Sequence, residues 1–188
     1  MTIRSLKLPM VFDVRRLQAD AARFAASEWT PHFNIHNYEG EWSVVPLRAV
    51  KGGQVAIYPD PNAPDGYVET DMMSRCGYIP QVLRAFECEL QTVRFLKLAA
   101  GSAIKRHRDY ELGLEDGFIR IHIPVLTNAD VDFVLDEQHL VMTAGECWYV
   151  NVNFHHSVRN DGETERIHLI VDCVVNDWLR SFFDLAEG

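Results

Sequence analysis

"FIRIHIPV", residues 118–125, and "ERIHLIVD" farther along the chain share the tripeptide Arg-Ile-His inside a run of branched apolar residues. Such runs favour β-strands. Alternate side chains of a strand share a face, so Arg120 and His122 point away from the isoleucines around them. Arg166 and His168 repeat this arrangement in the second run. These polar faces either meet water, as in a half-solvated sheet, or line a cavity that suits an anion.

The composition describes a soluble globular protein. The chain has 188 residues, of which 47% are hydrophobic, enough for one domain with a sizeable core. Eighteen Lys and Arg against 27 Asp and Glu give a net charge of −9, which argues against binding to nucleic acid or an anionic membrane. No stretch has the apolar length of a signal peptide or a membrane span. The four cysteines form no Cys-x-x-Cys pair, so we expect reduced thiols in a cytoplasmic protein.

Residues 91–175 are expected to form a β core, because turn signals there separate several short apolar runs. The expected strands are residues 92–98, 118–126, 131–135, 139–142, 147–152 and 166–174. This spacing, after an α-rich start, predicts a mainly β protein with flanking helices, a double-stranded β-helix (jelly roll) of cupin type. Because that fold encloses a cavity between its sheets, it favours the interior position for the two Arg-Ile-His faces.

Residues 1–90 are expected to form a mixed part that packs on this core within one domain of residues 1–188. The expected elements are strands at 6–12 and 42–50, helices at 13–27 and 79–86, and a C-terminal helix over 176–188, the first helix being capped by Asp13. The Pro- and Gly-rich loop of residues 51–71 has the length of a lid over the cavity mouth, where Tyr58 and Tyr67 could contact substrate. An ordinary exposed loop is the alternative.

Two further stretches carry residues that bind metals. In "KRHRDYE", His107 and Asp109 are two residues apart, so an extended backbone can aim both side chains at one point. "NFHHSVRN" supplies His155 and His156. His-x-Asp with a distant third histidine is the pattern of a 2-His-1-carboxylate site, which holds Fe(II) and leaves positions open for substrate and oxygen. Adjacent residues of a strand point to opposite faces, so spacing alone does not choose between the last two histidines.

From about residue 93 to residue 178 the chain resembles the aspartyl/asparaginyl β-hydroxylase family of 2-oxoglutarate-dependent dioxygenases, which also includes bacterial hydroxylases of free L-proline. The resemblance rests on an ordered series: Gly101, His107-Arg-Asp109, Arg120-Ile-His122, Phe154-His-His156-Ser-Val158 and Arg166 before "IHLIVD". In the family the distal metal histidine lies ten residues before the arginine that binds the co-substrate. The resemblance therefore implies His107, Asp109 and His156 as the metal ligands, rather than His155.

Three departures from the family limit what carries over. Some members have glycine where this chain has Asp109, which implies closeness to the proline-hydroxylating branch. A serine that helps to hold the co-substrate in some members corresponds to Leu96. The proline hydroxylases tend to continue into a C-terminal extension that this sequence does not have, so their substrate is not carried over.

The resemblance implies an Fe(II)- and 2-oxoglutarate-dependent dioxygenase that uses O2 to hydroxylate an unactivated carbon. The substrate would be an amino acid, free or within a peptide or a small natural product. The far carboxylate of 2-oxoglutarate needs a buried cation, and a guanidinium matches it with two hydrogen bonds. We expect Arg166 to supply it, with Arg120 and His122 near the keto-acid end or the substrate and His168 packed behind them.

Two other functions compete with this one. The first is a non-catalytic cupin-like module that binds a metal or a small anion. The second is a different metal-dependent cupin enzyme, whose site would favour further histidines over an aspartate. Asp109 and Arg166 together argue against both, because neither function requires a carboxylate ligand paired with a buried arginine.

Overall fold

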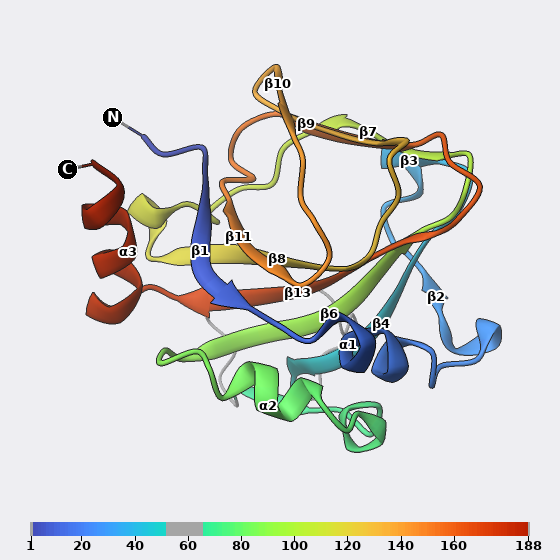
Figure 1. The fold of residues 1–188 in the computed structure, drawn as a ribbon, viewed down its shortest axis with the longest axis horizontal. Helices are drawn as coiled ribbons and strands as arrows, with labels where there is room; N and C mark the ends of the chain where they lie inside the picture. Colours follow the sequence, from blue (N-terminus) through green and yellow to red (C-terminus); the bar gives the residue numbers. More distant parts are fainter. Residues whose placement is uncertain (1, 52–65, 188) are drawn as a thin grey trace.

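The computed structural model describes residues 2–51 and 66–187, which are built around two antiparallel β-sheets that lie face to face (Figure 1). The strands are β1 (Ser5–Val11), β2 (Thr30–Pro31), β3 (Tyr38–Glu39), β4 (Trp42–Val50), β5 (Tyr67–Glu69), β6 (Leu90–Leu98), β7 (Ser102–His107), β8 (Phe118–Leu126), β9 (Val131–Leu135), β10 (Gln138–Leu140), β11 (Glu146–Val150), β12 (His156–Asn160) and β13 (Arg166–Val174). The larger sheet has the order β1-β11-β8-β13-β6-β4-β2, with β5 paired to β4. The smaller sheet has the order β10-β9-β12-β7-β3. A mainly β architecture with flanking helices is thereby confirmed.

The helices lie on the outer side of the larger sheet and along its edge (Figure 1). The α-helices are α1 (Val14–Ala21), α2 (Ile79–Leu83) and α3 (Asp177–Glu187), and the 3-10 helices are η1 (Ala26–Glu28), η2 (Ile35–Asn37), η3 (Met73–Arg75) and η4 (Leu114–Asp116). The apolar side chains of the three α-helices join those of the sheet in one continuous core. None of the helices in the described ranges is long and apolar enough to cross a membrane.

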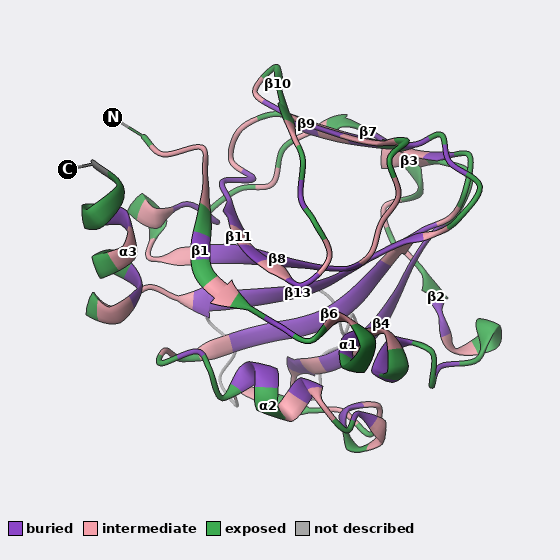
Figure 2. Cartoon of the chain, viewed as in Figure 1, coloured by how far each residue is buried: buried purple, intermediate pink, exposed green. Residues whose placement is uncertain are grey.

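Strands β8 and β13 are buried on both faces, and the two faces differ in chemistry (Figure 2). Ile119, Ile121 and Ile123 join the core under the helices. Arg120 and His122 alternate with them and lie between the sheets, where they are only 8% and 7% exposed. The polar faces of these strands are therefore interior, and the half-solvated alternative is wrong.

The N-terminal helix is shorter than the sequence pattern predicts. We expected a helix over residues 13–27, and Asp13 does cap it by accepting a hydrogen bond from the backbone N of Arg16. The helix nevertheless ends at Ala21, and the chain turns so that Phe24 packs on Phe95 of β6. Burial of this aromatic side chain outweighs the helical periodicity of the sequence.

Strands β7 and β12 of the smaller sheet, like the two-residue strand β3, were not expected as strands. Both are short, and the side chains on their outward faces are polar, so they lack the apolar run that marks a strand in sequence. The expected loop of residues 51–71 lies largely outside the described residues, including Tyr58. Its last part forms β5, in which Tyr67 pairs with Val50.

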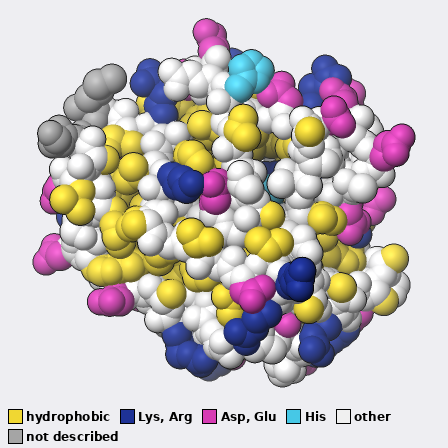
Figure 3. Space-filling view, in the orientation of Figure 1, with side chains coloured by type: hydrophobic (Ala, Val, Ile, Leu, Met, Phe, Trp, Pro, Cys, Tyr) yellow, Lys and Arg dark blue, Asp and Glu magenta, His cyan; other side chains and the backbone are white. Residues whose placement is uncertain are grey.

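Acidic and basic side chains are interspersed on the face of the protein shown in Figure 3. This mixture is consistent with the net charge of −9 and with a surface that does not present a basic patch on that face.

A buried carboxylate connects two helices on the outer side of the larger sheet. Asp20 of α1 is 2% exposed and accepts hydrogen bonds from the backbone N of Gly77, Tyr78 and Ile79, at 2.8, 2.7 and 2.9 Å. These three N–H groups precede and begin α2, whose first turn has no other side-chain cap. Asp20 thus satisfies backbone donors that helix geometry leaves unpaired.

We expect Asp20→Ala to lower the free energy of unfolding by at least about 2 kcal/mol, because it leaves three N–H groups, among them the buried one of Ile79, without their acceptor. Asp13→Ala removes an exposed cap on the same helix and should cost only about 1 kcal/mol. Urea denaturation of both variants tests this. Equal losses for the two variants would contradict the role assigned to Asp20.

Candidate active site

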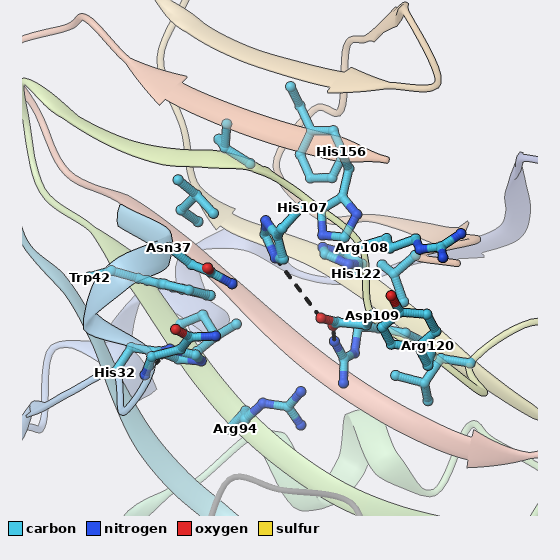
Figure 4. A pocket seen from close by; sticks show the side chains of 18 of the residues that line it. His32, Asn37, Trp42, Arg94, His107, Arg108, Asp109, Arg120, His122 and His156 are labelled. Carbon is cyan, nitrogen blue, oxygen red and sulfur yellow. Dashed lines mark hydrogen bonds and ion pairs between the residues drawn. The ribbon is translucent and has the colours of Figure 1, made fainter. Parts of the chain in front are cut away.

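A cavity of about 640 Å³ lies between the two sheets (Figure 4). Its wall carries most of the polar residues that the sequence analysis singled out, together with aromatic side chains. The polar and aromatic lining includes His32, Asn37, Trp42, Arg94, His107, Asp109, Arg120, His122, His156 and Arg166. The structure therefore brings all six predicted site residues to one cavity.

Two histidines meet where strands β7 and β12 pair. His107 ends β7, His156 begins β12, and the antiparallel register sets them directly opposite each other, with ring centroids 4.3 Å apart. The Nδ1 atom of His107 lies 2.7 Å from the carbonyl oxygen of Lys105, and that of His156 lies 3.0 Å from the carbonyl oxygen of Phe154. A carbonyl accepts only from an N–H, so both rings carry a proton on Nδ1, which leaves Nε2 as the atom that can ligate a metal.

Burial lowers the pKa of His156 to about 4, and the neighbouring His107 adds to this shift. The His156 ring is therefore neutral near pH 7, the form that ligates a metal. His155 is exposed and does not line the cavity; its carbonyl accepts from the backbone N of Asp136. Of the two adjacent histidines, only His156 faces the other candidate ligands.

Asp109 lies beside the two histidines but is turned towards an arginine. Its Oδ1 is 3.9 Å from Nε2 of His107, and its Oδ2 accepts a hydrogen bond from Nη1 of Arg120. Burial raises the pKa of the Asp109 carboxyl, but the Arg120 guanidinium and the two histidines outweigh it and hold the pKa below its usual range. As placed, no three His, Cys, Asp or Glu side chains of the described residues converge closely enough to hold an ion.

A fully buried carboxylate, Asp172 of β13, holds two arginines from the neighbouring strands. Arg120 Nε donates to Asp172 Oδ1 at 2.8 Å, and Arg94 Nη1 of β6 donates to Asp172 Oδ2 at 2.9 Å. The hydroxyl of Thr92 also donates to Asp172 Oδ2, at 2.6 Å. Burial raises the pKa of Asp172, but Arg120 and Arg94 outweigh this and hold it far below the usual range. Asp172 is therefore ionised, and a row of alternating charges runs Arg94–Asp172–Arg120–Asp109.

Arg166 differs from both of these arginines because no carboxylate among the described residues pairs with it. It is 3% exposed; its Nη2 donates to Nδ1 of His168 at 2.9 Å, and its Nε has no partner in the described part of the chain. Burial alone lowers its pKa to about 9. His168 does not line the cavity and orients the guanidinium from behind, while His122 lines it with an unpartnered Nε2.

The sequence analysis missed Arg94, Asp172 and the aromatic wall. A signal existed for Asp172, because it lies on the same strand face as Arg166 and His168 in "RIHLIVD". Arg94 likewise alternates with apolar residues in β6. The wall of His32 and Trp42 gave no sequence signal, because it forms only when the segment before β4 folds back over the cavity.

Comparisons with known proteins agree with this geometry. The sequence model of the family described as Aspartyl/Asparaginyl beta-hydroxylase matches residues 12–175. The chain is also 26% identical over 179 residues to L-proline cis-4-hydroxylase of Rhizobium meliloti (strain 1021). That alignment covers 94% of this chain and 62% of the relative, so the chain spans about three-fifths of the relative's length.

Solved structures resemble the fold at low sequence identity. A prolyl-4-hydroxylase of Pseudomonas putida superposes with a TM-score of 0.54 at 13% identity, covering 92% of this chain and 93% of its own. HygX of Streptomyces hygroscopicus, solved with nickel and 2-oxoglutarate bound, gives 0.54 at 11% identity and covers 94% and 84%. These likenesses identify the two-sheet sandwich as the jelly roll that the strand pattern predicted. Since the family match extends over most of the chain, the protein belongs to the aspartyl/asparaginyl β-hydroxylase family.

Proposed function

We propose that the protein is an Fe(II)- and 2-oxoglutarate-dependent dioxygenase that hydroxylates an unactivated carbon of an amino acid, free or within a peptide or a small natural product. The observation that carries this proposal is Arg166, a buried cation that faces a cavity and has no carboxylate partner within residues 2–51 and 66–187. A buried charge is costly unless it is paired, so the site is suited to a carboxylate that arrives with a ligand. Membership of the family and the name of the proline-hydroxylating relative support the same reaction class.

The side chains of His107, His156 and Asp109 fit an Fe(II) site in their chemistry. Two imidazoles that carry a proton on Nδ1, and so can ligate through Nε2, and one ionised carboxylate are the donors of the 2-His-1-carboxylate class. The carbonyls of Lys105 and Phe154 hold the two rings in the required tautomer, as outer contacts of metal-bound histidines do. When bound, the iron and 2-oxoglutarate supply oxidation by O2, with succinate and carbon dioxide as the other products.

Asp172 gives Arg120 a second carboxylate partner, so Asp109 can turn from Arg120 to a metal ion without leaving the arginine unpaired. A dication competes with Arg120 for the Asp109 carboxylate. Because Arg120 also donates two hydrogen bonds to Asp172, it stays paired when Asp109 turns to a metal. Arg120 and His122 then remain beside the place we assign to the keto-acid end of the co-substrate, and Arg166 meets its far carboxylate.

A cytoplasmic location is part of the same proposal. All four cysteines are free thiols, and Cys76, Cys147 and Cys173 are buried. Burial raises the pKa of the Cys147 thiol, which makes it less reactive. Such inert thiols are typical of structural cysteines rather than of a disulfide framework.

Metal binding is expected to depend on His156 and not on its neighbour. His156→Ala removes one of three protein ligands and should weaken Fe(II) or Co(II) binding by at least about 100-fold, more than the loss of an outer contact. His155→Ala is the matched control and should leave binding unchanged, because that side chain is exposed outside the cavity. Anaerobic calorimetry measures both. Loss of the metal in the His155 variant alone would overturn the assignment.

Co-substrate binding is expected to depend on Arg166. Removing one partner of a buried charge pair costs about 2–5 kcal/mol, so Arg166→Ala should bind 2-oxoglutarate roughly 30-fold to several-thousand-fold more weakly. Arg166→Lys should recover only part of this, because an ammonium lacks the planar fork of a guanidinium.

The measurement is an anaerobic 2-oxoglutarate titration of each metal-loaded variant. Metal affinity, measured separately, should stay at the parent value, since Arg166 is not among the proposed ligands. Parent-like 2-oxoglutarate affinity in Arg166→Ala would remove the main support for the proposed function.

A further inference from the structure

A short turn before β12 contacts two of the three proposed metal ligands from behind. It comprises residues 151–155, and we call it the ligand turn. The carbonyl of Val152 accepts a hydrogen bond from the backbone N of Asp109 at 2.9 Å. The carbonyl of Phe154 accepts from Nδ1 of His156 at 3.0 Å. The position of the ligand turn therefore sets the position of both ligands.

The segment before β1 is bound to the start of the ligand turn. Asn151, which is fully buried, donates its backbone N–H to the carbonyl of Arg4 at 2.8 Å, and its side-chain amide donates to the carbonyl of Ile3 at 3.5 Å. Its Oδ1 accepts from the backbone N of Asn153 at 3.2 Å. Two segments that lie 148 positions apart in the sequence thus meet at Asn151.

The side chain of Arg4 extends from this contact to the other end of the ligand turn. Its guanidinium carbon lies 5.2 Å from the centre of the Phe154 ring, and its Nε donates to Oδ2 of Asp136. Asp136 lies between β9 and β10, and its backbone N donates to the carbonyl of His155 at 2.8 Å. A planar guanidinium can lie over an aromatic ring and pair with a carboxylate at the same time. Arg4 therefore connects the ring of Phe154 with the hairpin that holds His155.

The exposure of these contacts argues against a role for Arg4 in global stability alone. Its side chain is 37% exposed and that of Asp136 is 33% exposed, and ion pairs of this kind contribute little to the free energy of unfolding. The residues that Arg4 contacts are nevertheless those next to a proposed ligand, because the Phe154 carbonyl holds the tautomer of His156. The position of Arg4 suits it to fixing the ligand turn.

We propose that Arg4 is a positioning residue of the metal site, which fixes the ligand turn and, through the carbonyl of Phe154, keeps the His156 ring directed at the metal. This inference rests on the proposed function, because it takes His156 as a metal ligand. Arg4 does not line the cavity, so its effect has to pass through the turn. A loosened turn lets the His156 ring rotate away from a bound ion more often, which speeds the release of the metal.

The test measures that release. Parent and variants are loaded with Co(II) without oxygen and mixed with excess chelator, and the visible absorption of bound Co(II) is followed by stopped flow. Loss of an outer contact of a metal ligand weakens metal binding by about 10- to 100-fold. Arg4 acts one contact behind the Phe154 carbonyl, so Arg4→Ala should release Co(II) about tenfold faster than the parent, at the low end of that range.

Further variants assign the effect to the contact between Arg4 and Phe154. Arg4→Lys keeps the charge without the planar group, and its release rate should lie between those of the parent and Arg4→Ala. Phe154→Leu keeps the carbonyl and removes the ring. Combined with Arg4→Ala, it should speed release by clearly less than the product of the two single effects, because both changes break the same contact.

Lys7→Ala is the matched control. Lys7 also lies near the start of the chain and forms an exposed ion pair, with Glu146 of β11, which is outside the ligand turn. This variant should release Co(II) at the parent rate. Urea denaturation of the metal-free variants should give similar, small losses of stability for Lys7→Ala and Arg4→Ala. If Arg4→Ala does not fold, Arg4→Lys and Phe154→Leu carry the test.

Three results would overturn the inference: parent-like release from Arg4→Ala, equal acceleration in Lys7→Ala, or single effects of Arg4→Ala and Phe154→Leu that multiply fully. A loss of stability in the Arg4 variant with unchanged release is the first of these and identifies a merely structural residue. Failure of the proposed function is a different result. The parent then does not bind Co(II), or His156→Ala binds it as tightly as the parent, and both claims fall.

Discussion

The carboxylate of Asp172, fully buried in the middle of the larger sheet, is the interaction on which the cavity depends. A charge in that position persists only with close partners, and it has them on both sides, Arg120 from β8 and Arg94 from β6. The pairing keeps two guanidinium groups inside the protein at the edge of a cavity. Arg120 in turn orients Asp109, so one buried anion organises the wall that faces the two histidines.

The two Arg-Ile-His strands are alike in sequence but not in electrostatics. Arg120 has two carboxylates, which raise its pKa against the opposing effect of burial, whereas Arg166 has none in the described part of the chain and its pKa falls. The difference arises because Asp172 lies directly across from Arg120 in the register of β8 and β13, while Arg166 pairs with Leu98 of β6. One arginine is consequently part of the protein's own charge network, and the other is the one that we propose binds a ligand.

Much of this arrangement could be predicted from sequence, because the alternation of polar and apolar residues in β8 and β13 is a local property. The same property could not decide between His155 and His156, since that choice needs the position of β12 against β7. Arg94 and Asp172 escaped notice for a related reason. Their importance comes from partners on other strands, and a single sequence does not give the strand register.

Hydroxylation coupled to 2-oxoglutarate turnover is the central claim, and the stoichiometry of products tests it most directly. The purified protein is incubated with Fe(II), 2-oxoglutarate and oxygen across free amino acids and short peptides, and succinate and hydroxylated product are quantified together. We predict that one substrate yields succinate and a hydroxylated product in equal amounts. Tight binding of Fe(II) and 2-oxoglutarate without succinate above background for any substrate would contradict the claim and identify a non-catalytic cupin-like binding module.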